Sequence, residues 1–170
     1  MARRVFHASV ILGGRRPARA LEHFRRIGGS ASGARALCVL DRDDGSAPAQ
    51  ACAAEPGLEF FTWSRRHVES YLLVPSAIRR ALRLRDDDAR VERALRSHLP
   101  PDGDESAYRD VDAKRLLGRN GALRRALGRP LPLSDIARAT RETELHPDVL
   151  ALFARLHEAL GSAGAASLSP

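Results

Sequence analysis

Three carboxylates crowd the end of an apolar run in the stretch CVLDRDDG, at Asp41, Asp43 and Asp44. Carboxylates this close repel one another and resist ionising together. Asp41 and Asp43 are two residues apart, and alternate residues of an extended segment point the same way. Two carboxylates aimed at one point suit a hard cation such as magnesium or calcium, whose charge offsets their repulsion. The stretch is equally typical of a solvated turn, where Asp and Gly are common.

A further acid, Glu69, stands among apolar residues in HVESYLL, residues 67–73. An acid in such company needs a cation, an arginine or a helix N-terminus as its partner. The plainer alternative is a half-exposed glutamate paired with Arg65 or Arg66. His67 is close by in the sequence, but we expect an exposed histidine there.

The elements that must position these acids follow from the first 63 residues. Short apolar runs predict strands over residues 5–12, 34–40 and 58–63, and helices are predicted over 17–28 and 47–55. This β-α-β-α-β order implies an α/β fold, with a small parallel sheet and right-handed crossovers. Because the carboxyl ends of parallel strands meet at one edge, we expect Asp41, Asp43 and the segment after residue 63 to lie there together.

The remainder of the chain reads as helical. Helices are predicted within residues 74–84, 86–99, 111–118, 122–128, 133–142 and 146–161, with a loop over 100–106 and Ser134 as a cap. We therefore divide the chain into an α/β core (1–85), a helical extension packed on it (86–160) and a disordered tail (161–170). The leucine stripes of the later helices are interpreted as core, although a homodimer face is the alternative.

The composition favours polyanionic partners. The chain has 170 residues and a formal net charge of +7, and Lys114 is its only lysine. Nearly all of the positive charge is arginine, which binds phosphate in a bidentate way and favours DNA as a partner. A GC-rich coding sequence also explains the arginine content, and we give that cause more weight. The sequence has no apolar run of about eighteen residues that would span a membrane, and its two scattered cysteines favour a reduced cytoplasmic compartment.

Together, LDRDDG (residues 40–45) and RRHVESYLLVPSAI (residues 65–78) resemble the TOPRIM domain of OLD-family (overcoming lysogenization defect) nucleases and related ATPase-linked phage-defence proteins. The resemblance covers roughly residues 5–85 and implies a TOPRIM-like fold with a Mg²⁺- or Mn²⁺-dependent DNA endonuclease site. It implies that Asp41, Asp43 and Glu69 are metal ligands, with Glu69 also a supporting catalytic acid. It further implies that Lys114 steadies the phosphate or the leaving group.

The sequence departs from that family in two places. The first strand of the family ends in an acidic V-E-G-x-x-D pattern, whereas this chain has ILGGRRPA. Gly13 therefore stands in place of the usual Glu and Pro17 in place of the usual Asp. Family members also carry an ABC-like ATPase ahead of the domain, but no G-x-x-x-x-G-K-[ST] motif occurs here. An ATPase would have to be a separate or upstream partner.

Three other classes of protein are alternatives to the nuclease. A haloacid-dehalogenase phosphatase would need its acid motif after the first strand, and a receiver domain would need an acid pair on that strand. The stronger alternative is a degenerate, non-catalytic TOPRIM-like module that binds nucleic acid or an ATPase partner. In either of the two main cases we nominate the arginines near the predicted site as nucleic-acid contacts, namely Arg15, Arg16, Arg42 and Arg119.

Overall fold

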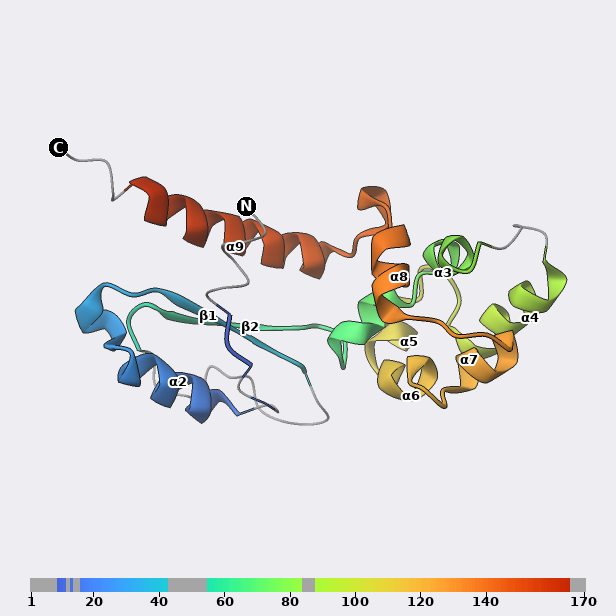
Figure 1. The fold of residues 1–170 in the computed structure, drawn as a ribbon, viewed down its shortest axis with the longest axis horizontal. Coiled ribbons are helices and arrows are strands. Elements are labelled where there is room, and N and C mark those ends of the chain that lie inside the picture. The colour runs from blue at the N-terminus through green and yellow to red at the C-terminus, as the bar shows by residue number, and fades with distance from the viewer. Residues whose placement is uncertain (1–8, 12, 14–15, 43–54, 84–87, 166–170) are drawn as a thin grey trace. The chain divides into compact units, whose positions relative to one another are not determined.

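The computed structural model describes residues 9–11, 13, 16–42, 55–83 and 88–165. The chain forms two compact units (Figure 1), each described by itself below. The sheet unit comprises residues 1–40 and 47–62, and the helical unit comprises residues 41–46 and 63–170. The division falls after Thr62, not near residue 85, because the segment that follows the second described strand packs its side chains with the later helices.

The sheet unit confirms two of the predicted strands and their parallel pairing. Strands β1 (Ala36–Leu40) and β2 (Leu58–Thr62) pair in parallel register, from Ala36 opposite Leu58 to Leu40 opposite Thr62. The protein is therefore a mixed α/β protein with a small parallel sheet. Residues 9–11 of the predicted first strand are not in a strand, and the rest of that strand lies outside the described residues, as does nearly all of the predicted 47–55 helix.

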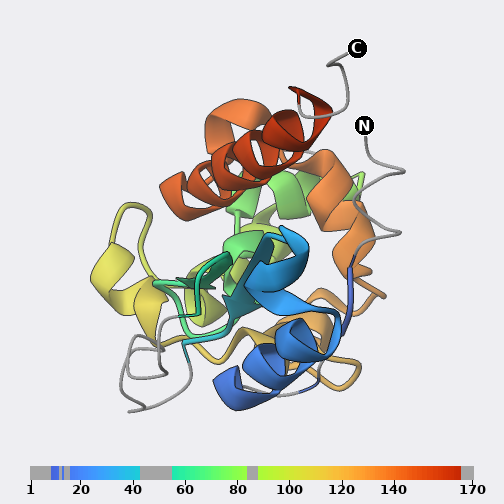
Figure 2. The ribbon, with the colours of Figure 1, turned by 90° about the vertical axis from the view of Figure 1, so that its left-hand side faces the viewer.

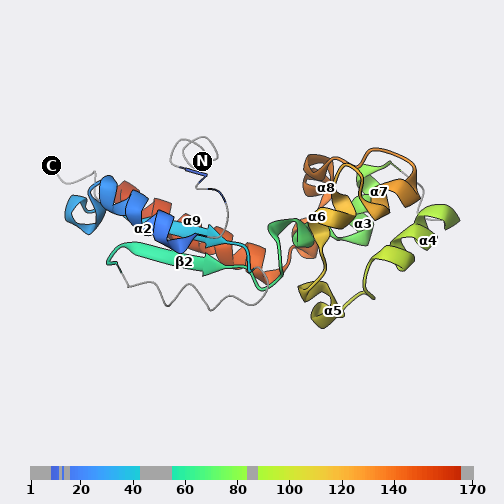
Figure 3. The same cartoon turned by 90° about the horizontal axis from the view of Figure 1, so that it is seen from below.

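Helix α2 (Pro17–Arg26) runs alongside the strand pair in Figures 1 and 3. Figure 2 shows the same helix, in blue, after a turn of 90°. Pro17 opens the helix, where its missing N–H costs nothing. Phe24 is its buried anchor. After a short 3-10 turn, η1 (Gly29–Ser32), the chain enters β1. Gly57, just before β2, has φ +86°, and a Cβ there would lie 2.7 Å from the Ala34 carbonyl oxygen, so the close approach requires glycine.

The helical unit contains seven α-helices and two 3-10 turns in the part of the chain that the structure describes. They are η3 (Val68–Leu72), α3 (Pro75–Ala81), α4 (Ala89–His98), α5 (Glu105–Arg109), α6 (Ala113–Leu117), α7 (Ala122–Leu127), α8 (Leu133–Ala139), η4 (Glu142–Glu144) and α9 (Pro147–Ala165). Helix α5 begins inside the predicted loop. Helix α9 continues to Ala165, so residues 161–165 of the predicted tail are helical, and their alanines are good helix formers.

Aspartates start three of these helices. Asp88 accepts from the Arg90 and Val91 amides at 3.0 and 3.2 Å, and Asp104 and Asp112 cap α5 and α6 in the same way. Each cap satisfies amides that have no partner within the helix. Ser134 does not cap α8 as predicted. The N-cap position is Pro132, two residues before Ser134, so the Ser134 hydroxyl lies within the first turn and reaches Asp135 at 3.4 Å.

The leucine stripes of the later helices form the core, as the default interpretation predicted. The buried cluster is centred on side chains that are almost fully inaccessible, and these are Leu73, Ile78, Leu95, Leu123 and Ile136. Small residues, including Ala77 and Ala113, let the short helices approach one another. Among the described residues, no helix is long and apolar enough to cross a membrane.

Candidate active site

The centre of the candidate site is an ion pair between Asp41 and Lys114, which are 73 residues apart in the chain. Asp41 follows β1 directly, and Lys114 is the second residue of α6. The Lys114 Nζ lies 3.0 Å from Asp41 Oδ2, and both side chains remain partly exposed. The structure therefore brings together two residues that the sequence analysis assigned to one site.

The segment that carries Glu69 meets the same carboxylate. The backbone N–H of Val68, the residue before Glu69, donates to Asp41 Oδ1 at 3.1 Å. Both oxygens of Asp41 are thus engaged, one by a backbone amide and one by an ammonium group. This orientation is set by two separate elements, η3 and α6, so the Asp41 carboxylate has a defined position.

Four buried side-chain atoms have no hydrogen-bond partner within the described part of the chain. Three belong to the segment that carries Glu69, namely His67 Nδ1, Glu69 Oε2 and Ser70 Oγ, and the fourth is Arg42 Nε, in the residue after Asp41. Buried polar atoms are nearly always paired in native proteins, and unpaired ones point to a missing ligand, water or ion. His67 is only 7% exposed, so the expectation of a surface histidine was wrong. Nothing in its charged sequence neighbourhood signals this burial.

Glu69 does not form the ion pair with Arg65 that the plainer alternative expected. Arg65 is 10% exposed and instead makes a bidentate pair with Glu105, with Nε–Oε1 and Nη2–Oε2 distances of 2.9 and 2.6 Å. Its guanidinium also stacks on Tyr71 and Tyr108, with centroid distances of 5.1 and 4.7 Å. Because α5 supplies Glu105, the partner of Arg65 was invisible to local sequence patterns.

Arg65 and Tyr71 together close the loop that presents Val68 and Glu69. The Arg65 Nη1 donates to the Ser70 carbonyl oxygen at 2.8 Å, and the Arg65 amide donates to the Tyr71 hydroxyl at 3.1 Å. The Tyr71 hydroxyl in turn donates to Asp148 at the start of α9. Asp148 also accepts from the Ser64 hydroxyl at 2.5 Å and from the Ser64 amide at 2.9 Å. We refer to Ser64, Arg65, Tyr71, Glu105 and Asp148 as the Arg65 network.

The electrostatics of the Arg65 network follow from these bonds. Hydrogen bonding from the Arg65 guanidinium lowers the pKa of Glu105 despite partial burial. Burial by itself raises the pKa of Asp148, but the hydrogen bonds from Ser64 and Tyr71 more than offset it, and the pKa is lowered. Burial and the bond to Asp148 raise the pKa of Tyr71 to about 12. At neutral pH the network therefore holds two ionised carboxylates and a protonated phenol.

A second support fixes the segment just after Asp41. The Arg42 guanidinium forms an ion pair with Asp110 and donates to the Arg109 carbonyl oxygen at 3.1 Å. The Arg66 amide donates to the same carbonyl oxygen at 2.9 Å. The end of α5 therefore ties residue 42 to residue 66. These contacts favour a positioning role for Arg42, which the sequence analysis nominated as a nucleic-acid contact.

The remaining predicted site residues are distributed as follows. Asp43 and Arg15 lie outside the described residues. Arg119 is exposed between α6 and α7 in the helical unit, and Arg16 is exposed at the start of α2 in the sheet unit. Gly13 has φ +69°, a conformation that non-glycine residues rarely adopt. A glutamate at Gly13, the residue type that the family has there, would therefore be strained.

The donor set for a cation is small in the residues that the structure describes. No group of three or more His, Cys, Asp or Glu side chains is arranged there to hold a metal ion. Glu69 Oε2 is the buried acceptor that lacks a partner, and Asp41 is the neighbouring carboxylate tied to the same segment. Carboxylate oxygens are the ligands that Mg²⁺ prefers, so these two carboxylates are the donors that a predicted metal site would have to use.

Comparison with known proteins identified no match among protein families, curated proteins or solved structures. The resemblance to OLD-family TOPRIM domains therefore stays a prediction from the sequence.

Proposed function

We propose that this chain is a TOPRIM-like domain that hydrolyses phosphodiester bonds in DNA with the help of Mg²⁺ or Mn²⁺. The observation that supports it best is the 3.0 Å contact between Lys114 and Asp41. The resemblance assigned these two residues to one site, and local sequence patterns cannot produce a contact across 73 residues. From the same resemblance, the proposal includes an ABC-like ATPase on a separate or upstream segment.

Each residue has a distinct role in this proposal. Asp41 and Glu69 would hold the cation, and a bound divalent cation lowers the pKa of water and neutralises charge on a phosphate. Lys114 supplies a fixed positive charge beside Asp41, where it would stabilise the charge that develops on the phosphate oxygens or the leaving group. The Val68 amide holds Asp41 in one orientation. His67 and Ser70 offer further polar atoms next to Glu69.

The test is plasmid nicking with Mg²⁺, with Mn²⁺ and with EDTA, beside calorimetric titration of each metal. Asp41→Asn should abolish nicking and weaken metal binding, because it removes a charged ligand while keeping an acceptor for the Val68 amide. Lys114→Gln should lower the rate roughly 100-fold with less effect on metal affinity. Asp135→Asn and Arg138→Gln are matched controls, since these residues form an exposed ion pair at 3.3 Å on α8.

A non-catalytic nucleic-acid-binding module is the second candidate. It is favoured by Gly13, which stands in place of the family's Glu and has φ +69°, a conformation that a glutamate rarely adopts. In that case folded wild-type protein would bind DNA in EDTA but would neither bind metal nor nick plasmid. That outcome would refute the nuclease proposal and leave the binding module in its place.

A further inference from the structure

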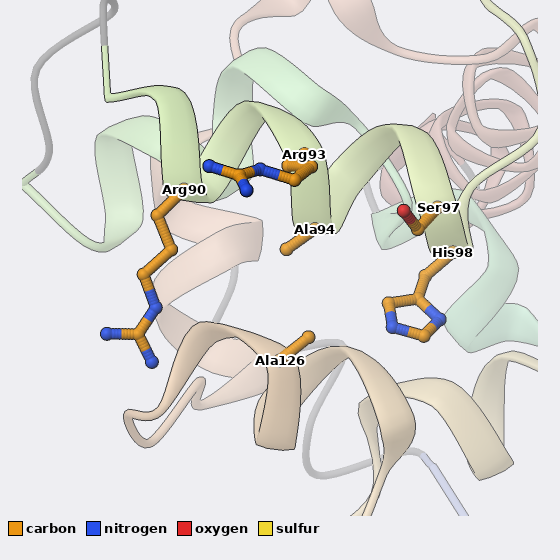
Figure 4. Close-up of a pocket in the computed structure, with 6 residues that line it drawn as sticks. All are labelled: Arg90, Arg93, Ala94, Ser97, His98 and Ala126. Atoms are coloured by element: carbon orange, nitrogen blue, oxygen red, sulfur yellow. The ribbon is translucent and has the colours of Figure 1, made fainter.

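An open hollow of about 470 Å³ lies between α4 and α7 in the helical unit. Arg90, Arg93, Ser97 and His98 line it from α4, and Figure 4 shows Ala94 and Ala126 facing each other across it. The α4 residues recur at the three- and four-residue spacing that places side chains on one helix face. The hollow exists because two alanines meet where larger side chains would fill the space between the helices.

The polar groups that line the hollow can all donate hydrogen bonds. Two guanidinium groups, one hydroxyl and one imidazole surround it, and its described lining contains no carboxylate. Guanidinium groups match the geometry of phosphate oxygens through two parallel hydrogen bonds. The chemistry of this lining therefore selects an anion with several acceptor oxygens.

The acid of α4 does not neutralise this face. Glu92 lies on the same helix but pairs with Arg79 and Arg96, neither of which lines the hollow. Arg90 is also positioned by α7. Its Nη2 lies 2.7 Å from the place that a Cβ of Gly128 would occupy, so the guanidinium rests against glycine backbone at the end of α7. The absence of a side chain at Gly128 lets Arg90 reach across the hollow.

We propose that the α4–α7 hollow binds phosphate groups of a nucleic-acid strand. The choice of a strand rests on the proposed function and on the net charge of +7, whereas the phosphate chemistry rests on the lining alone. The hollow is open to solvent and about 470 Å³ in volume, which is enough for a backbone phosphate with its sugar. The methyl groups of Ala94 and Ala126 form the apolar floor for the sugar.

The test measures binding of a fluorescent 20-nucleotide DNA duplex by anisotropy at several salt concentrations, with EDTA present throughout. Because EDTA removes metal chemistry, failure of the nuclease proposal would not affect this result. The variant Arg90→Gln/Arg93→Gln should reduce the slope of log affinity against log salt by about 2, since each lost phosphate contact contributes about 0.9. Affinity at low salt should fall by at least about tenfold.

The control variant Arg96→Gln/Arg138→Gln removes the same charge from exposed arginines that pair with acids outside the hollow. It should change the slope little. Equal losses in the two double variants would overturn the site, because net charge would then explain the binding. Ala126→Glu provides a second route: it leaves both arginines in place, adds a carboxylate that repels phosphate, and should weaken binding as the first variant does.

Inorganic phosphate and adenosine monophosphate, titrated by calorimetry, distinguish a strand from a small anion. We expect both to bind at least 100-fold more weakly than the duplex, because a strand makes several contacts at once. If either binds as tightly as the duplex, the hollow is a small-anion site and the proposal of a strand contact is overturned. Unchanged duplex binding by both the arginine variant and Ala126→Glu would refute the phosphate site itself.

Discussion

The same short segment, residues 63–72, supplies two polar regions with opposite hydrogen-bonding states. In the Arg65 network, Arg65 and Tyr71 find partners on α5 and α9. A few residues away, His67, Glu69 and Ser70 each have a buried atom without a partner in the described residues. Both regions draw on polar side chains of one segment, and they differ in whether another element supplies hydrogen-bond partners for those side chains.

The comparison distinguishes residues that position the loop from residues that we propose to bind a ligand. A satisfied buried network rigidifies the backbone around it, whereas unsatisfied buried atoms cost stability unless something else repays them. The Arg65 network closes the loop that carries Val68 and Glu69. The unpaired atoms belong to the same loop whose Val68 amide donates to Asp41, the partner of Lys114. The arrangement is that expected of a site whose missing partner is a ligand.

The largest expected effect comes from breaking the satisfied region. Arg65→Met keeps the stem of the side chain but leaves Glu105 without its guanidinium and removes the stacking on two tyrosines. We expect a loss of about 2 kcal/mol in the free energy of unfolding, because the buried guanidinium loses its hydrogen bonds and its stacking, while the half-exposed Glu105 stays partly solvated. Urea titration followed by the fluorescence of Trp63 measures it, since the Trp63 ring lies 4.8 Å from Tyr71.

Arg138→Met is the matched control, because Arg138 forms an exposed ion pair with Asp135 in the same unit. This variant should lower the free energy of unfolding by about 0.5 kcal/mol. Equal losses for the two variants would mean that the Arg65 network does not hold the loop.

An effect of intermediate size is expected on how stability depends on pH in acid. The pKa of Glu105 is lowered by the hydrogen bond from Arg65, so its folded value lies below the unfolded value near 4.5. A lowered carboxylate pKa contributes stability above the unfolded pKa, and this contribution is lost as the pH falls through the folded pKa. Glu105→Gln should therefore make the unfolding midpoint less dependent on pH below about 5. Urea midpoints between pH 7 and pH 3 test this, with Asp135→Asn as the charge control, and an unchanged acid profile would contradict it.

The smallest effect is expected in the unsatisfied region. Glu69→Gln removes a charge whose buried oxygen has no partner, so the free energy of unfolding should change by less than about 1 kcal/mol, in either direction. Metal should stabilise the wild type and not this variant, because binding to the folded state raises stability by mass action. Thermal unfolding with and without Mg²⁺ measures both effects. A loss above about 2 kcal/mol would show instead that Glu69 is a structural residue.

Local chemistry made several parts of this protein predictable from the sequence. The apolar runs around Cys38 and Phe60 gave the two parallel strands, and Pro17 with Gly28 bounded α2. Acidic residues at the start of α4 marked its N-terminus, where Asp88 caps it. These features depend on neighbours within a few residues, so the sequence carries them directly. The predicted cap at Ser134 was wrong, because Pro132 occupies the N-cap position two residues earlier.

Long-range pairing was decided only by the tertiary structure. The chain holds 28 basic and 21 acidic residues, so many ion pairs of similar energy are conceivable from the sequence. The partner of Arg65 is Glu105 and not Glu69, and His67 is buried, because α5 packs beside the loop at residues 65–72. A single surface ion pair contributes at most about 1 kcal/mol, far less than the burial of a helix face. The packing of the apolar faces therefore chooses which charges meet, and it placed Lys114 on Asp41.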